Sequence, residues 1–114
     1  MADVQAGATG STTSSGAILV SITGNSIIGS GSKTVTTAGS RVQLSSISIP
    51  CKKLTIQGLS SNTGAIYIGD STVASSNGIF VYATQMYQLT PSNLNLVYLD
   101  SAVNGEGVIY LYEN

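Results

Sequence analysis

The sequence predicts an all-β protein, a single antiparallel β-sandwich of the jelly-roll type with an extended N-terminal arm. Its apolar side chains are mostly Val, Ile, Leu and Tyr, which suit a pleated, half-buried surface. Short apolar runs separated by turn residues recur about every ten residues, a spacing typical of antiparallel sandwiches and barrels. No stretch supports a long helix. Eight or nine strands fit a jelly roll, with a seven-stranded immunoglobulin-like sandwich as the alternative.

The chain of 114 residues is long enough for one domain and too short for two ordinary ones. Residues 1–16 are mainly Ala, Gly, Ser and Thr and offer almost nothing to bury, so we expect an arm there. Such an arm either orders on a neighbouring subunit or is a frayed terminus without a role. The sandwich is expected over residues 17–114.

The first predicted strands are short and lie between glycine-rich turns. Residues 17–23 (AILVSIT) form an apolar run that stops at Gly24 and Asn25. Residues 26–28 form a second run, which we expect to end in a turn over residues 29–31 (GSG). The next strand is expected over residues 33–37 (KTVTT).

Residues 41–49 are predicted to form one strand with a β-bulge. Val42 and Leu44 share one parity, whereas Ile47 and Ile49 share the other. A slip of one residue turns every later side chain to the opposite face, and a bulge near residues 45–46 would explain it.

The middle of the chain has the clearest strand patterns. Residues 52–58 (KKLTIQG) alternate cleanly after Pro50, which predicts that Leu54 and Ile56 face the core. The next strand is expected over residues 65–68 (AIYI), after a loop with the turn residues SSNTG.

Four more strands are expected in the last third of the chain, over residues 79–82, 86–89, 94–99 and 108–112. Asn-Gly at positions 104–105 lies between the last two apolar runs. This dipeptide is the strongest short-range signal for a hairpin, so we expect those two strands to pair directly.

Charged residues make up only 8% of the chain, against about a quarter in typical soluble domains. One interpretation is a polar but uncharged surface; the one we favour is a surface covered largely by protein partners. Every charge over residues 4–69 is positive, and the charges after them are negative. Opposite charges of this kind would help neighbouring subunits to align with one another, so the candidate interface residues include Lys52, Lys53 and Arg41. Four cations so widely spread do not predict nucleic-acid binding.

The side chains do not predict catalysis, a cofactor or a metal site. The chain has no His, and its single cysteine, Cys51, is expected to be an inert, buried small hydrophobe. A pair of acids could serve a glycosidase, but solvated turn acids explain them better. Residues 100–106 (DSAVNGE) look superficially like a calcium loop but lack the required ligand spacing. The four acids in question are Asp70, Asp100, Glu106 and Glu113.

The tyrosines are the main candidates for an interface. Tyr is favoured at interfaces because it buries much area while keeping a polar tip. Tyr110 and Tyr112 share a face opposite Ile109 and Leu111, so they form an outward row if the aliphatic side is the core. The alternative is that the rings merely cover the sheet. The six candidates are Tyr67, Tyr82, Tyr87, Tyr98, Tyr110 and Tyr112.

No apolar run approaches the ~20 residues that cross a bilayer, and the first residues lack the basic region of a signal peptide. We therefore expect neither a membrane partner nor export, and synthesis inside a cell.

Several blocks in the last two-thirds of the chain resemble a family of small bacteriophage virion structural proteins. These blocks are IPCKKLTIQGLSSNTGAIYIGD, STVASSNG and LVYLDSAVNGEGVIYLYE, and they occur in the family's order over residues 49–114. Residues 1–48 match nothing in that pattern.

The resemblance implies a component of the virion on the capsid surface, assembled in the cytoplasm of the host cell. The first expectation is a decoration (cement) protein that binds the major capsid protein as an oligomer, with a homotrimer favoured, and stabilises the shell. The alternatives are a head-fibre or tail adhesin with a carbohydrate-binding sandwich, and a self-assembling filament subunit.

Overall fold

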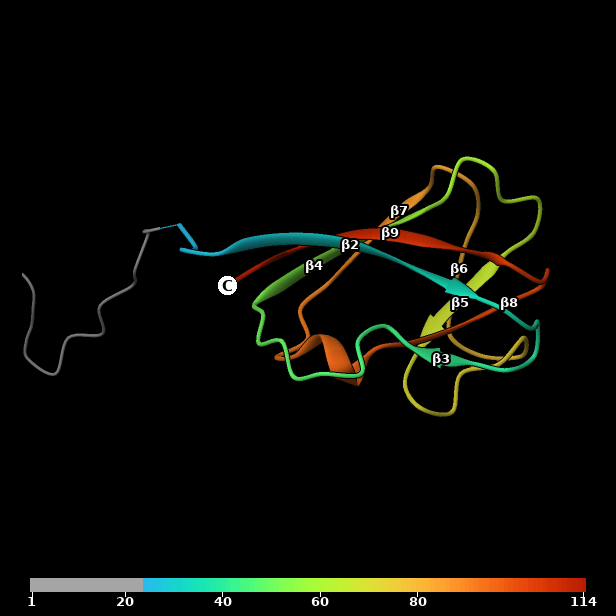
Figure 1. Cartoon of the computed structure of the whole chain (residues 1–114), viewed down its shortest axis with the longest axis horizontal. Helices are drawn as coiled ribbons and strands as arrows, with labels where there is room; N and C mark the ends of the chain where they lie inside the picture. Colours follow the sequence, from blue (N-terminus) through green and yellow to red (C-terminus); the bar gives the residue numbers. More distant parts are fainter. Residues whose placement is uncertain (1–23) are drawn as a thin grey trace, which may run out of the picture.

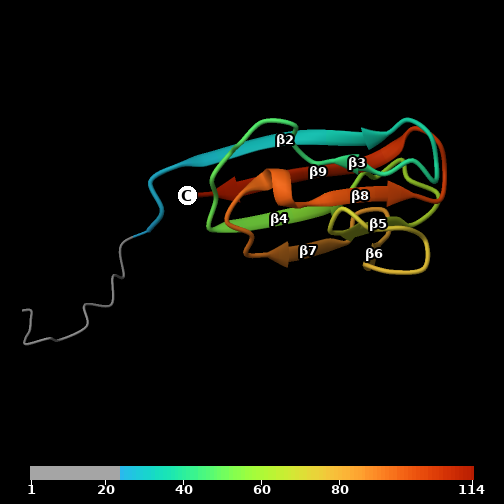
Figure 2. The same ribbon diagram turned by 90° about the horizontal axis from the view of Figure 1, so that it is seen from below.

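The computed structural model describes residues 24–114, which form two packed β-sheets (Figures 1 and 2). The predicted arm over residues 1–16 and the predicted strand over residues 17–23 lie outside the described residues.

Each sheet has four strands, and every strand pairing is antiparallel. One sheet has the order β2-β9-β4-β7 and the other the order β3-β8-β5-β6. The strands of the first sheet are β2 (Ile28–Val35), β9 (Glu106–Glu113), β4 (Lys53–Gly58) and β7 (Met86–Leu89). Those of the second are β3 (Val42–Gln43), β8 (Tyr98–Ser101), β5 (Ile66–Gly69) and β6 (Ile79–Val81), and a short 3-10 helix, η1 (Leu94–Leu96), precedes β8.

The pairings are nested, as in one long hairpin wrapped into two layers. β2 pairs with β9, β3 with β8, β4 with β7, and β5 with β6. Eight strands in two such sheets make a jelly roll, as predicted, and not the immunoglobulin-like alternative.

The core lies between the two sheets. The alternation of β4 places Leu54 and Ile56 there with no exposed surface, which confirms the predicted inward face. From the opposite sheet, Ile66, Ile68 and Leu99 pack into the same cluster. The predictions for residues 52–58, 65–68, 79–82, 86–89 and 108–112 are confirmed within a residue or two at most ends by β4, β5, β6, β7 and β9.

The predicted turn over residues 29–31 was wrong, because β2 runs straight through it. Gly29 and Gly31 lie opposite Tyr112 and Tyr110 of β9, and a Cβ at either glycine would overlap the facing ring. The glycines therefore leave room for the rings rather than bending the chain, as glycines in strands do where another group approaches closely.

The predicted bulge near residues 45–46 was also wrong. β3 stops at Gln43, and Ser45 closes a local turn, its hydroxyl donating to the Ile47 carbonyl (2.8 Å) and accepting from the Ile47 amide (3.3 Å). The change of parity thus marks the end of a strand rather than an extra residue within one.

Two predictions in the last third need correction. Residues 94–99 form η1 and the start of β8, because the Asn93 side chain caps a helical turn there (Asn95 N to Asn93 Oδ1, 3.0 Å). The turn at Asn104-Gly105 links β8 to β9, but these strands belong to different sheets and do not form a hairpin. The turn is held by β2 instead, through a bond from Gly105 N to the Val35 carbonyl (2.8 Å).

Candidate interaction surface

Within residues 24–114, no three His, Cys, Asp or Glu side chains gather where they could hold a metal ion. Cys51 is buried, as predicted, and its thiol donates to the Pro91 carbonyl (3.1 Å). Burial raises the pKa of the Cys51 thiol, which keeps it in its unreactive protonated form.

Two of the candidate acids organise loops through hydrogen bonds. Glu106 accepts bonds from Thr63 N (2.7 Å), Thr63 Oγ1 (2.8 Å) and Gly64 N (3.0 Å). These bonds, led by that from the Thr63 amide, hold the pKa of Glu106 below its usual value. Asp70 accepts from the hydroxyl and the amide of Thr72, and these bonds lower its pKa as well.

Asp100 is not the solvated turn acid that the sequence predicts. It lies in β8 and is 3% exposed. Its Oδ1 accepts from Gly39 N (2.9 Å) and Ser101 N (2.8 Å), which fastens the turn after β2 to the second sheet. The Asp100 carboxylate is thus hydrogen-bonded to backbone amides within the fold.

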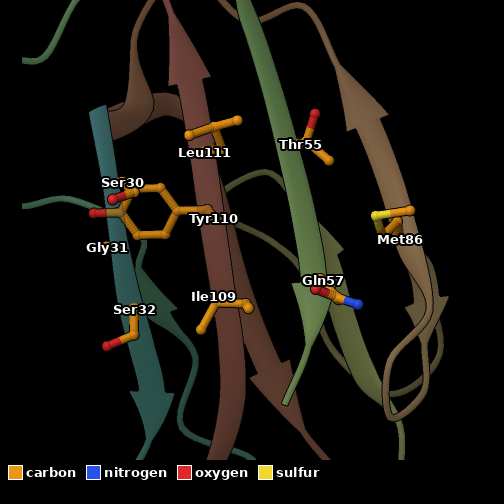
Figure 3. Close-up of a pocket in the computed structure, with 9 residues that line it drawn as sticks. All are labelled: Ser30, Gly31, Ser32, Thr55, Gln57, Met86, Ile109, Tyr110 and Leu111. Carbon is orange, nitrogen blue, oxygen red and sulfur yellow. The ribbon is translucent and has the colours of Figure 1, made fainter. Parts of the chain in front are cut away.

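The outer face of the first sheet carries a shallow groove of about 640 Å³. Ile109 and Leu111 of β9 run along its middle and are each more than 40% exposed. The side chains that line this face come from all four strands (Figure 3). We call the surface formed by the following residues the outer groove: Ser30, Ser32, Thr55, Gln57, Met86, Ile109 and Leu111.

A second apolar surface opens at the edge of the sandwich, where the edge strands β6 and β7 leave a cleft of about 590 Å³. Ile79 and Tyr87 line it from the two strands, and Leu96 of η1, 54% exposed, lines it as well. Asp70 is the one charged residue of its lining. We call this surface, formed by the following residues, the edge cleft: Ile68, Gly69, Asp70, Gly78, Ile79, Tyr87, Leu89, Pro91, Leu96 and Val97.

The structure separates the six candidate tyrosines into three environments. Tyr82 and Tyr87 are exposed; Tyr87 lines the edge cleft, whereas Tyr82 lines neither of the two surfaces. Tyr67 is buried on the outer side of the second sheet, where its ring meets Phe80 edge to face (centroids 4.9 Å apart) and Tyr98 packs against the same small cluster.

Tyr110 and Tyr112 face the core, so the expected outward row of tyrosines is reversed. Both rings pack against the main core cluster, whereas Ile109 and Leu111 point outward. Figure 3 shows the Tyr110 ring extending from β9 toward Gly31 of β2. The glycines of β2 leave space for the two rings on the core side of the sheet. Because side chains alternate along a strand, the aliphatic side chains of β9 then lie on the outer side.

The basic candidates do not gather in one place. Lys53 forms an ion pair with Glu113 (3.9 Å) at one end of the first sheet, next to the exposed Lys52. Arg41 donates to the Val73 carbonyl (3.3 Å) beside the second sheet. Phosphate-backbone binding needs several cations along one path, and this arrangement does not provide it.

Sequence reasoning missed the aliphatic residues of the outer groove. Ile109 and Leu111 alternate with two tyrosines, and either set could have faced the core. The usable signal was the pair of glycines at positions 29 and 31, whose meaning depends on the pairing of β2 with β9.

Comparisons of the chain with protein-family models, with curated proteins and with solved structures found no match. No helix in the described part of the chain has the length and apolar character to span a membrane.

Proposed function

We propose that this protein is a non-enzymatic structural subunit of a bacteriophage particle, a capsid decoration protein. It binds the major capsid protein as an oligomer on the surface of the virion and stabilises the shell. The phage assignment rests on the resemblance over residues 49–114, and the mode of action rests on the surface of the fold.

The exposure of apolar side chains carries the proposal. Among residues 24–114, twelve large hydrophobic side chains are exposed, and several gather in the outer groove and the edge cleft. Soluble monomers rarely expose large contiguous apolar patches, and such patches mark surfaces that another molecule covers. A protein partner suits them because interface cores are depleted of charge and enriched in aromatic residues and Met.

The edge cleft is the surface that we assign to the capsid. Its rim is apolar, with Ile79, Tyr87 and Leu96 exposed, and Asp70 adds one negative charge. An extended apolar segment with a basic residue, supplied by the capsid subunit, would satisfy both features.

The experiment mixes the purified protein with undecorated capsids and measures co-sedimentation and the thermal stability of the shell. We expect binding in hundreds of copies per particle and a higher melting temperature of the shell. Leu96→Asp should weaken binding at least tenfold, because it places a charge on the apolar rim, whereas Val103→Asp, at an exposed apolar residue outside both surfaces, should bind normally.

Three results would reject the proposal. Failure of the wild-type protein to bind capsids would remove its basis. A copy number of only a handful per particle would indicate a fibre or tail adhesin instead. Fibres of varied length in electron micrographs of the purified protein would indicate a filament subunit.

A further inference from the structure

We infer that the outer groove is the surface through which copies of this chain associate, each turning it toward a common symmetry axis. The inference deepens the proposed function, which needs an oligomer, and names the surface where copies meet. Its test needs no capsid, so it succeeds or fails separately from the capsid assignment.

The pattern of side chains across the face is a stripe with two polar flanks. Ile109 and Leu111 on β9 form the stripe. In register beside them lie Ser32 and Ser30 of β2 on one side, and Gln57 and Thr55 of β4 on the other. Met86, opposite Gln57 on β7, adds a further exposed apolar side chain.

This pattern is complementary to itself. A rotation about an axis that is parallel to β9 and lies in front of this face brings the stripe of one copy onto the stripe of another. The same rotation places the serine hydroxyls of β2 opposite Thr55 and Gln57 of the neighbour, groups that can donate and accept hydrogen bonds with them. A surface that meets its own copy around an axis must have this property.

The distribution of charge on this face also favours a second copy of the chain as the partner. Among the described residues, two charged side chains lie on this face, Lys53 and Glu113, and they pair with each other within one copy (3.9 Å). The groove itself is lined by uncharged residues. Two identical faces therefore meet without repulsion, whereas a partner with a charged surface would find no counter-charge along the groove.

The geometry of the face also suits another sheet. Extended sheets pack face to face about 10 Å apart through interdigitating side chains. Ile109 and Leu111 protrude from the middle of such a face, where two or three sheets around one axis would bury them.

The first measurement is the mass of the purified protein in solution by light scattering. We expect two or three times the 11.6 kDa of one chain. Leu111→Asp should reduce the mass to that of one chain, because a charge in the stripe would be buried against its own copies. Leu96→Asp, in the edge cleft, is the matched control and should leave the mass unchanged.

A cross-linking measurement does not depend on the tolerance of the fold for a charge. Cys51 is buried, so Leu111→Cys creates one accessible thiol on the described surface, close to the proposed axis. Mild oxidation should link two chains through this residue, whereas Leu96→Cys should remain unlinked. A wild-type protein with the mass of one chain, or equal linking of both cysteine variants, would overturn the inference.

Discussion

Gly107 of β9 lies directly opposite Thr34 of β2. A Cβ at this position would overlap the Lys33 carbonyl and approach the Thr34 Cα. Its amide and carbonyl also bond with the buried Asn62 side chain (Asn62 Nδ2 to Gly107 O, 2.7 Å). One residue without a side chain thus allows the two strands and a loop to meet.

Gly107→Ala should destabilise the fold by about 1–3 kcal/mol, because overpacking against backbone atoms forces the two strands apart. Chemical denaturation would measure the loss. Gly24→Ala is the matched control, since a Cβ there meets no atom within 4 Å. Equal midpoints for the two variants would contradict the close approach at Gly107.

At the scale of elements, Glu106, the first residue of β9, holds the loop after β4. Its carboxylate accepts three hydrogen bonds, from the amides of Thr63 and Gly64 and from the hydroxyl of Thr63. The charged form accepts these bonds best, so the pKa of Glu106 is lower in the folded protein than in the unfolded chain.

The sign of this shift predicts how stability depends on pH. A lowered pKa gives stability that is present above the unfolded value of about 4.3 and is lost as the pH falls through the folded pKa. Glu106→Gln should therefore be less stable than the wild type at pH 7, and the difference should shrink by pH 3. Urea midpoints of the two proteins at both pH values test this; a difference that stays constant would rule it out.

The elements that the sequence predicted well are those with local causes. The alternation in β4 reveals its buried face without reference to any other strand. The first half of β2 and the pairing of the strands on either side of Asn104-Gly105 were mispredicted because partners distant in the sequence decide them: the rings of β9 cover the glycines of β2, and the Val35 carbonyl holds the turn. Turn-like dipeptides therefore carry less information in a jelly roll, where consecutive strands often belong to different sheets.

The candidate site was predictable in kind but not in position. The low charge indicated a covered surface, and six of the exposed apolar side chains of the structure gather in the outer groove and the edge cleft. Of the six tyrosines, however, Tyr67 serves a buried cluster and Tyr110 and Tyr112 face the core. Each ring is able to occupy either side of a sheet, and only the pairing of strands decides which.

At the scale of the whole molecule, the first sheet has an apolar surface on both sides. Its inner face packs against the second sheet, and Ile56 has no exposed area there. Its outer face presents Ile109, 42% exposed, from the neighbouring strand. The second sheet covers the inner surface, whereas no described residue covers the outer stripe, which the proposed association would bury.

The same substitution on the two sides separates folding from association. Ile56→Ala should lower the free energy of unfolding by about 2–5 kcal/mol, because it removes buried methyl groups and leaves a cavity between the sheets. Ile109→Ala should change the unfolding of a single chain by less than about 0.5 kcal/mol, as surface substitutions usually do. Its effect should appear instead as a thermal midpoint below that of the wild type at high protein concentration, and this difference should shrink on dilution, because association stabilises the fold by mass action and is weaker in the variant. Calorimetry over a hundredfold range of concentration measures both effects, and a large, concentration-independent loss for Ile109→Ala would place that residue in the core rather than at an interface.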